Sequence, residues 1–162
     1  MLALNFILLS LATFIGIICG SFLIIFFAFD EHVKGEKYFI LMQRATIGIM
    51  AVFLIYTAIA KSLYLNILPA LLLIIVAWLT YKNINIHYIY LIFPLALVFS
   101  IKDTFSLLAV STLIFFYGIV AGTLIVREYE WKDGLVNCLM YIYYPAISIL
   151  LYFLLPLFIP NL

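Results

Sequence analysis

The chain has 162 residues, of which 69% are hydrophobic and 9% are charged, and its formal net charge is +1. A soluble domain typically contains about 45–50% apolar and about 25% charged residues, so this chain cannot build a water-soluble surface and we expect lipid to be its solvent. The length suits a single polytopic transmembrane domain, residues 1–162, and the near-neutral charge argues against nucleic-acid binding.

The first predicted element is a membrane helix over Leu4–Phe29. No charged residue occurs before Asp30, and this run is too long for the apolar region of a signal peptide, which covers about 7–15 residues. Small residues recur at every fourth position in the segment, at Ala12, Gly16 and Gly20. Small residues at this spacing form a groove on one helix face, which allows a neighbouring helix to approach closely.

The second predicted helix covers Arg44–Tyr64, and in an alternative interpretation it begins as early as Tyr38. The third and fourth predicted helices are short and cover Ile67–Tyr81 and Ile86–Ile101. At about 1.5 Å per residue they only just cover a hydrocarbon core of about 30 Å. We therefore keep two interpretations, in which these helices either span the bilayer or form a re-entrant pair.

The fifth and sixth predicted helices cover Thr104–Val126 and Leu135–Ile159. The prediction is thus an all-α integral membrane protein with about six transmembrane helices, or with four full spans if the short pair is re-entrant. Six of the eight Lys and Arg residues lie in the first, third and fifth connections. The positive-inside rule then places these connections in the cytoplasm and both termini outside, for a multi-pass protein of the cell membrane.

One octapeptide pattern occurs twice, as FIGIICGS at 14–21 and as FYGIVAGT at 116–123, where Gly118 and Gly122 repeat the four-residue spacing. A charged turn and then a Leu-Met pair follow each copy. We interpret helices one–two and five–six as two similar hairpins that arose by duplication. The alternative is coincidence, because such motifs are common in membrane helices. In either case we predict that the first and fifth helices make the tightest packing contact.

Charged residues gather in the two turns that follow the octapeptides. Carboxylates beside a histidine suit a divalent metal, and basic side chains suit a phosphate or an anionic headgroup. No ordered metal motif, phosphate loop or serine elbow accompanies them, so we expect no metal or cofactor and favour a solvated cap over a catalytic site. This predicted cytoplasmic cluster consists of Asp30, Glu31, His32, Lys34, Arg127, Glu128, Glu130 and Asp133.

The sixth predicted helix carries a polar stripe. Asn137, Tyr141, Ser148 and Tyr152 are spaced four, seven and four residues apart, so they share one face of a continuous helix. Pro145 lies on that face too and would free the carbonyl of Tyr141. Such a stripe either lines an uncharged permeation path or supplies hydrogen bonds between helices.

Three functions are compatible with these features. The first is a small transporter or channel for a neutral or weakly charged solute. The second is a non-catalytic subunit or assembly factor of a larger membrane complex. The third is a membrane enzyme that acts at the cytoplasmic headgroup face. In each case the expected partners are the lipid bilayer and either further copies of the chain or other membrane subunits.

Overall fold

The computed structural model describes residues 2–27, 32–79, 86–128 and 131–158, and it contains helices joined by short turns. The all-α prediction is therefore confirmed for this part of the chain. The elements in chain order are α1 Leu2–Phe27, α2 His32–Ala60, the 3₁₀ turn η1 Tyr64–Asn66, α3 Ile67–Leu79, α4 Ile86–Phe99, α5 Thr104–Glu128, α6 Trp131–Met140 and α7 Tyr143–Phe158.

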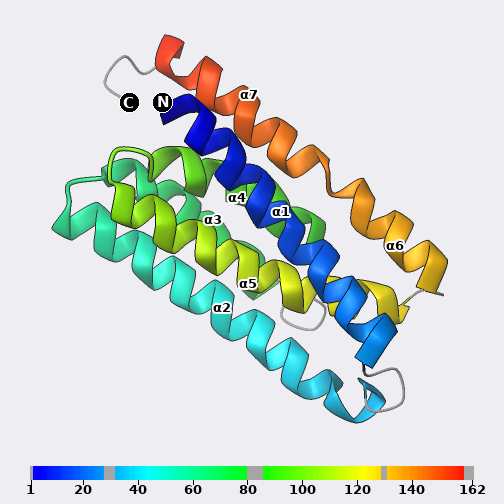
Figure 1. Cartoon of the computed structure of the whole chain (residues 1–162). Helices are drawn as coiled ribbons and strands as arrows, with labels where there is room; N and C mark the ends of the chain where they lie inside the picture. The colour runs from blue at the N-terminus through cyan, green and yellow to red at the C-terminus, as the bar shows by residue number, and fades with distance from the viewer. Residues whose placement is uncertain (1, 28–31, 80–85, 129–130, 159–162) are drawn as a thin grey trace.

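Four helical segments are long and apolar enough to cross a membrane. They are Ala3–Ile24, Lys37–Ala60, Thr104–Val126 and Asp133–Leu155. They run roughly along a common direction, and the beginning of α1 and the end of α7 lie at the same end of the bundle (Figure 1). The prediction of about six spans is therefore wrong in number among the described residues.

The third and fourth predicted helices are too short to count as spans. α3 has 13 residues and α4 has 14, which correspond to about 20 Å each at the usual helical rise of about 1.5 Å per residue. The chain before α3 is used for a turn, in which Ser62 has a φ of 55° and the N–H groups of Lys61 and Leu63 both donate to the carbonyl of Thr57. A second turn after Phe99 ends α4.

α4 forms the centre of the bundle. It packs against α3, α5 and α7, and nine of its 14 residues are buried, whereas Tyr88 and Leu91 on one face are exposed. A helix that is apolar all round has no face for water and is expected inside a protein or a membrane. Its sequence IHYIYLIFPLALVF fits that position, because polar side chains occur only in its N-terminal part.

The predicted sixth helix is interrupted at Tyr141 and Ile142, which separate α6 from α7 (Figure 1). Pro145 has no N–H, so it cannot donate to the carbonyl of Tyr141 as a helical residue would. The N–H of Tyr144 takes that carbonyl instead, at 3.0 Å, and the N–H of Tyr141 donates to Cys138 at 3.2 Å. The helix thus tightens to bonds between residues three apart and changes direction at this point.

The contact between α1 and α5 is the most extensive between any two described helices. A Cβ atom added to Gly16, Gly20, Gly118 or Gly122 would come within 3.0 Å of the backbone of the opposite helix. Gly20 faces Ile119, and Gly122 faces Ile17, so the seventh residue of each octapeptide meets the fourth residue of the other. The two copies pack against each other as a locally symmetric, parallel pair. We call this contact the glycine seam.

Two details of the predicted hairpin repeat differ from the structure. Ala12 is exposed and lies outside the glycine seam. α5 packs directly on α6, with Gly134 against Val126, whereas α1 packs mainly on α5, α6 and α7 rather than on α2. The two predicted hairpins therefore do not share one packing arrangement.

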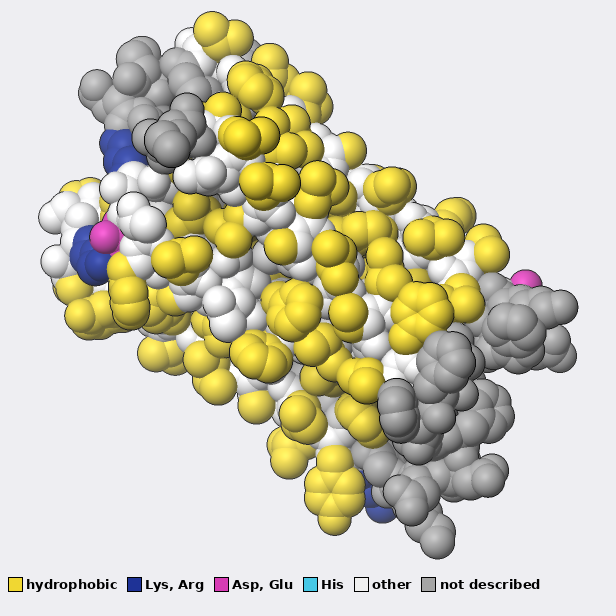
Figure 2. Space-filling model, viewed as in Figure 1, with side chains coloured by type: hydrophobic (Ala, Val, Ile, Leu, Met, Phe, Trp, Pro, Cys, Tyr) yellow, Lys and Arg dark blue, Asp and Glu magenta, His cyan; other side chains and the backbone are white. Residues whose placement is uncertain are grey.

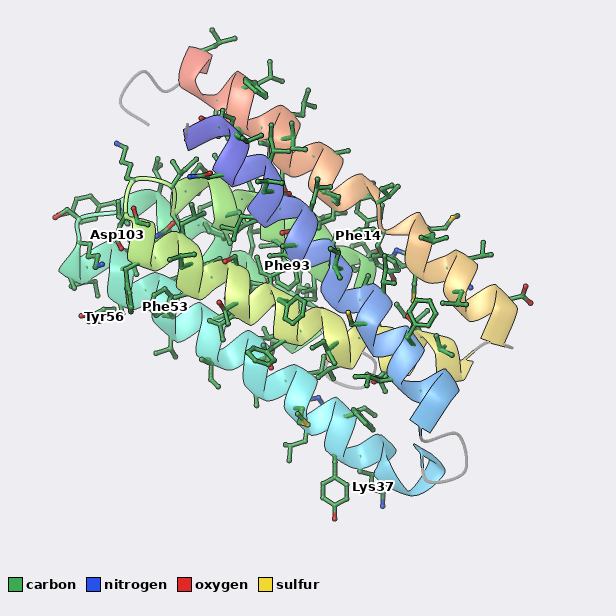
Figure 3. All side chains as sticks on the ribbon, viewed as in Figure 1. Phe14, Lys37, Phe53, Tyr56, Phe93 and Asp103 are labelled. Carbon is green, nitrogen blue, oxygen red and sulfur yellow. The ribbon has the colours of Figure 1, made fainter. Side chains whose placement is uncertain are left out.

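On the face shown in Figure 2 the flank of the bundle is largely apolar, and the visible charged side chains lie toward its ends. Lys37 and Asp103 mark two opposite ends (Figure 3). α2 begins at His32, so part of the first predicted charged turn is helical. With 29 residues this helix is about 43 Å long and exceeds a hydrocarbon core of about 30 Å. Its charged first turns can therefore lie beyond the core without breaking the helix.

Candidate functional site

Four tyrosines meet in the interior, where α4, α5 and the break between α6 and α7 come together. Tyr90, Tyr117 and Tyr144 have no exposed surface, and Tyr141 is 3% exposed. The ring of Tyr90 lies 4.9 Å from Tyr141, 5.6 Å from Tyr144 and 5.8 Å from Tyr117, between ring centroids. Phe93 closes the group and is labelled in Figure 3, near the middle of the bundle. We call the four tyrosines, without Phe93, the tyrosine cluster.

Hydrogen bonds tie the cluster to the two remaining long helices. The side-chain amide of Gln43 on α2 donates to the hydroxyl of Tyr117 at 3.0 Å. The hydroxyls of Tyr144 and Thr13 on α1 lie 2.8 Å apart, and Thr13 already donates to the carbonyl of Ser10. Because a hydroxyl has only one proton, Tyr144 is the donor to Thr13. The cluster therefore connects all four long segments.

Tyr90 differs from its neighbours. Its hydroxyl is buried and has no hydrogen-bond partner among the described residues. It reaches the glycine seam, where it lies 3.1 Å from the position that a Cβ of Gly118 would occupy. The missing side chain of Gly118 thus makes room both for α1 and for the end of the Tyr90 side chain.

The cluster lies at mid-height of the long segments. Thr13 and Tyr117 fall near the middle of the spans Ala3–Ile24 and Thr104–Val126. The first turn of α4 reaches the same level, because the ring of His87 stacks on Tyr141 with centroids 4.7 Å apart. α4 thus begins beside the interior of a spanning segment rather than at its end.

The site is uncharged in the described structure. None of the residues that form it carries a carboxylate, a lysine or an arginine. Among the described side chains, no group of three or more His, Cys, Asp or Glu residues is placed to hold a metal ion. The arrangement can offer hydroxyl donors and acceptors and aromatic faces, but no charged partner.

The structure divides the predicted polar stripe. Tyr141 joins the tyrosine cluster, and Ser148 is buried and donates to the carbonyl of Tyr144 at 2.9 Å. Tyr152 stacks on Phe6 of α1 at 4.8 Å, and Asn137 is half-buried on α6. The predicted stripe requires one continuous helix. The break at Tyr141 instead gives α6, which carries Asn137, a different direction from α7, which carries Ser148 and Tyr152.

Most side chains of the predicted cytoplasmic cluster lie outside the described part of the structure. Asp30, Glu31 and Glu130 lie outside the described residues. The backbone of His32 and Lys34 begins α2, and Arg127 and Glu128 end α5, but their side chains are not among those described. Asp133 lies exposed in the first turn of α6. Convergence of the two turns therefore stays a prediction.

A described ion pair lies at the other end of the bundle. Lys61, just after α2, pairs with Asp103, just before α5, and also lies 5.0 Å from the centre of the Phe105 ring. Asp103 accepts the N–H of Ser106 at 2.8 Å and so caps the N-terminus of α5. The bonds from Lys61 and Ser106 lower the pKa of Asp103 to about 2. The pair holds together the entry into η1–α3 and the exit from α4.

Sequence reasoning missed Gln43, Tyr90, Tyr117 and Tyr144. Gln43 carried a usable signal, because an uncharged amide inside an apolar segment needs a hydrogen-bond partner in lipid. Tyr117 lies inside the repeated octapeptide, whose spacing marks only the glycines as packing positions. Nothing in the sequence pairs these four residues, since they come from separate helices.

Comparisons with known proteins add no relative: no protein-family model, no curated protein and no solved structure matches the chain.

Proposed function

We propose that this chain is a multi-pass protein of the cell membrane that passes a small neutral solute through the bundle. The observation that carries the proposal is the tyrosine cluster, a buried and uncharged hydrogen-bonding centre at the height where α4 begins and where α6 gives way to α7. Interrupted helices at membrane depth commonly mark the solute sites of transporters. Of the stripe residues, Tyr141 belongs to this centre, and Ser148 and Tyr152 follow it along α7.

The chemistry of the site favours a neutral solute. A tyrosine hydroxyl both donates and accepts, so it can replace one of the hydrogen bonds that a solute loses when it leaves water. A charged solute in the membrane interior needs a charged partner, and ionisable residues at depth mark such paths. The described site has none, so alcohols, urea-like amides and water fit it better than ions.

The topology that accompanies this proposal has four spans and a re-entrant pair, α3 and α4. The Lys61–Asp103 ion pair joins the start and the end of that pair, so both lie at one face of the membrane. The contact of His87 with Tyr141 supports a turn at membrane depth. The distribution of Lys and Arg favours, for this topology, both termini outside.

The oligomeric part of the proposal is a homo-oligomer. A bundle of this length offers few helices to surround a path, so copies in contact would complete the wall. Native mass spectrometry from detergent is the direct measurement of this state, and a uniform monomer in every mild detergent would contradict it.

A flux assay tests the function. The purified chain in proteoliposomes is mixed with hyperosmotic glycerol or urea, and volume recovery is followed by light scattering. Wild type and Tyr56→Trp should recover faster than protein-free vesicles, because Tyr56 is exposed on α2. Tyr90→Trp, the matched change inside the cluster, should lose the gain. Wild-type recovery equal to that of protein-free vesicles for all solutes would reject transport and favour a non-catalytic subunit.

Thiol labelling gives an independent answer. Cys19 and Cys138 are removed, and single cysteines are placed at Tyr141, Ser148 and Tyr152, with Leu150 as a control that is 57% exposed on the apolar flank. A polar reagent should label the first three positions with a gradient from one side and leave Leu150 unlabelled. Protection of all three stripe positions would mean a dry, packed helix.

A further inference from the structure

We propose that the Tyr90 hydroxyl is the binding point for a small uncharged hydrogen-bonding molecule, either water or the hydroxyl group of a solute. The solute form of this inference rests on the proposed function, whereas the water form does not. Tyr90 is entirely buried, and its hydroxyl has no hydrogen-bond partner among the described residues. Buried polar groups in proteins nearly always have a partner, so an unsatisfied one calls for an explanation.

The neighbouring hydroxyls show that the cluster can satisfy such groups. Tyr117 is paired with Gln43, and Tyr144 is paired with Thr13. Tyr117 accepts from the amide of Gln43, so its own proton is not used in that bond. The hydroxyl of Tyr90 therefore has no partner among the described residues, and the hydroxyl of Tyr117 can still donate its proton. The rings of these two tyrosines are in direct contact.

Tyr90 also differs from the other described buried hydroxyls without a partner, which belong to Ser10 and Ser100. A serine hydroxyl can rotate to a carbonyl of its own helix one turn earlier, so it is satisfied by a small torsional change. The hydroxyl of a tyrosine stands too far from its own backbone for this bond. Only another residue or a bound molecule can supply its hydrogen-bond partner.

The surroundings define what can bind. Aromatic rings of Tyr117, Tyr141, Tyr144 and Phe93 surround the Tyr90 ring. The backbone of the glycine seam lies beside its hydroxyl, opposite Gly118. Rings and close-packed backbone leave no place for a large ligand, and the absence of charge among the cluster residues excludes the pairing that an ion requires. Water and the hydroxyl group of a small alcohol meet both conditions.

The first test asks whether removal of the Tyr90 hydroxyl raises or lowers the unfolding temperature. Tyr90→Phe removes only the hydroxyl, and Tyr144→Phe is the matched control that removes a hydroxyl with a known partner. We expect both variants to unfold at lower temperature than wild type in the same mixed micelles. If the Tyr90 hydroxyl binds nothing, its removal takes away an unsatisfied group, and the unfolding temperature of Tyr90→Phe rises or stays unchanged. That result would overturn the proposal.

An infrared difference spectrum gives a second readout that does not depend on stability. The O–H stretching band that is lost in Tyr90→Phe should be broad and lie at the lowered frequency of a hydrogen-bonded hydroxyl. A sharp band at the frequency of a free hydroxyl would contradict the proposal even if the variant were less stable.

Glycerol distinguishes the two sources of the ligand. Glycerol stabilises most proteins non-specifically, so the informative quantity is the difference between wild type and Tyr90→Phe at each glycerol concentration. A difference that grows with glycerol identifies a solute hydroxyl, and a constant difference identifies water. Absence of flux in proteoliposomes would remove the proposed function but leave a bound water at Tyr90 intact, so the two failures are separable.

Discussion

Buried polar side chains in this chain make two kinds of hydrogen bond. Thr123 and Ser148 donate to carbonyls of their own helices, which satisfies the hydroxyl but holds no helices together. Ser21 bonds to the carbonyl of Ile17 in its own helix and also lies 2.9 Å from the Sγ of Cys138 on α6. Gln43 and Tyr144 instead bond across helices. Hydrogen bonds between helices in membranes contribute only about 0.6 kcal/mol on average. Their loss matters more when it leaves the partner buried and unsatisfied.

The bond between Gln43 and Tyr117 gives the first prediction. Tyr117→Phe should lower the free energy of unfolding by about 1–3 kcal/mol, because the buried amide of Gln43 loses its acceptor. Adding Gln43→Met should restore part of this loss, since the unsatisfied group is then removed as well. The four unfolding curves of the double-mutant cycle in mixed micelles measure both effects. Additive losses would show that the two side chains are not coupled.

Asp103 gives a prediction for pH. Its pKa is depressed to about 2, below the usual value of about 3.9, so the paired carboxylate stabilises the fold at pH values above about 4. This contribution is lost as the pH falls from about 4 to about 2. We expect a loss of about 1 kcal/mol at most, because both side chains are partly exposed and solvent screens the pair. Asp103→Asn should remove this part of the pH dependence, and an unchanged acid profile would refute the assignment.

At the scale of elements, the glycine seam and the short helix α4 shape the bundle. The seam allows α1 and α5 to approach with backbone against backbone. The four glycines were recognisable from their spacing, but the limits of the stripe were not. Each four-residue step turns a helix by about 40° beyond a full turn, so a long stripe drifts away from a straight neighbour. Ala12, at the start of the stripe, is accordingly exposed.

Glycine substitutions test the seam with a control in the same chain. Gly20→Ala and Gly122→Ala should each lower the free energy of unfolding by about 1–3 kcal/mol or more, because the new methyl group meets backbone that cannot move aside. Gly48→Ala should raise it by up to about 1 kcal/mol, since nothing lies within 4 Å of its position and alanine favours the helix. Equal effects at all three sites, measured by unfolding in mixed micelles, would show that the seam is not close-packed.

At the scale of the whole molecule, the question is how deep the α3–α4 pair reaches. α3 has 13 residues, about 20 Å, against a hydrocarbon core of about 30 Å. Trp78 lies one residue before the end of α3 and is 75% exposed on the flank. In a re-entrant pair this indole lies within the acyl chains, whereas in a spanning helix it lies at an interface.

Depth-dependent quenching decides between these positions. Trp131→Phe leaves Trp78 as the single tryptophan of the chain. Its fluorescence in bilayers should be quenched most strongly by lipids brominated deep in the acyl chain, because the end of α3 stops short of the far interface. Trp78→Phe, which leaves Trp131, supplies the comparison. Strongest quenching of Trp78 by bromines near the headgroups would establish a spanning α3.

The sequence by itself determined the all-helical class and the approximate positions of the apolar helices. Its apolar content argued against a soluble surface, and its uncharged runs marked helices that are apolar enough for lipid, because both depend on local composition. The spacing of Gly16 and Gly20, and of Gly118 and Gly122, similarly marked a close helix contact, since a groove is a property of one helix face.

Only the tertiary structure decided which surfaces meet. The tyrosine cluster draws Tyr90, Tyr117 and Tyr144 from three helices, and their proximity follows from packing that no local pattern contains. The structure also showed that only four described segments are long enough to span, because α3 and α4 are apolar and their short lengths became clear only from their ends in the structure. Hydropathy measures how favourable each segment is in lipid. The burial of α4 depends instead on its contacts with α3, α5 and α7.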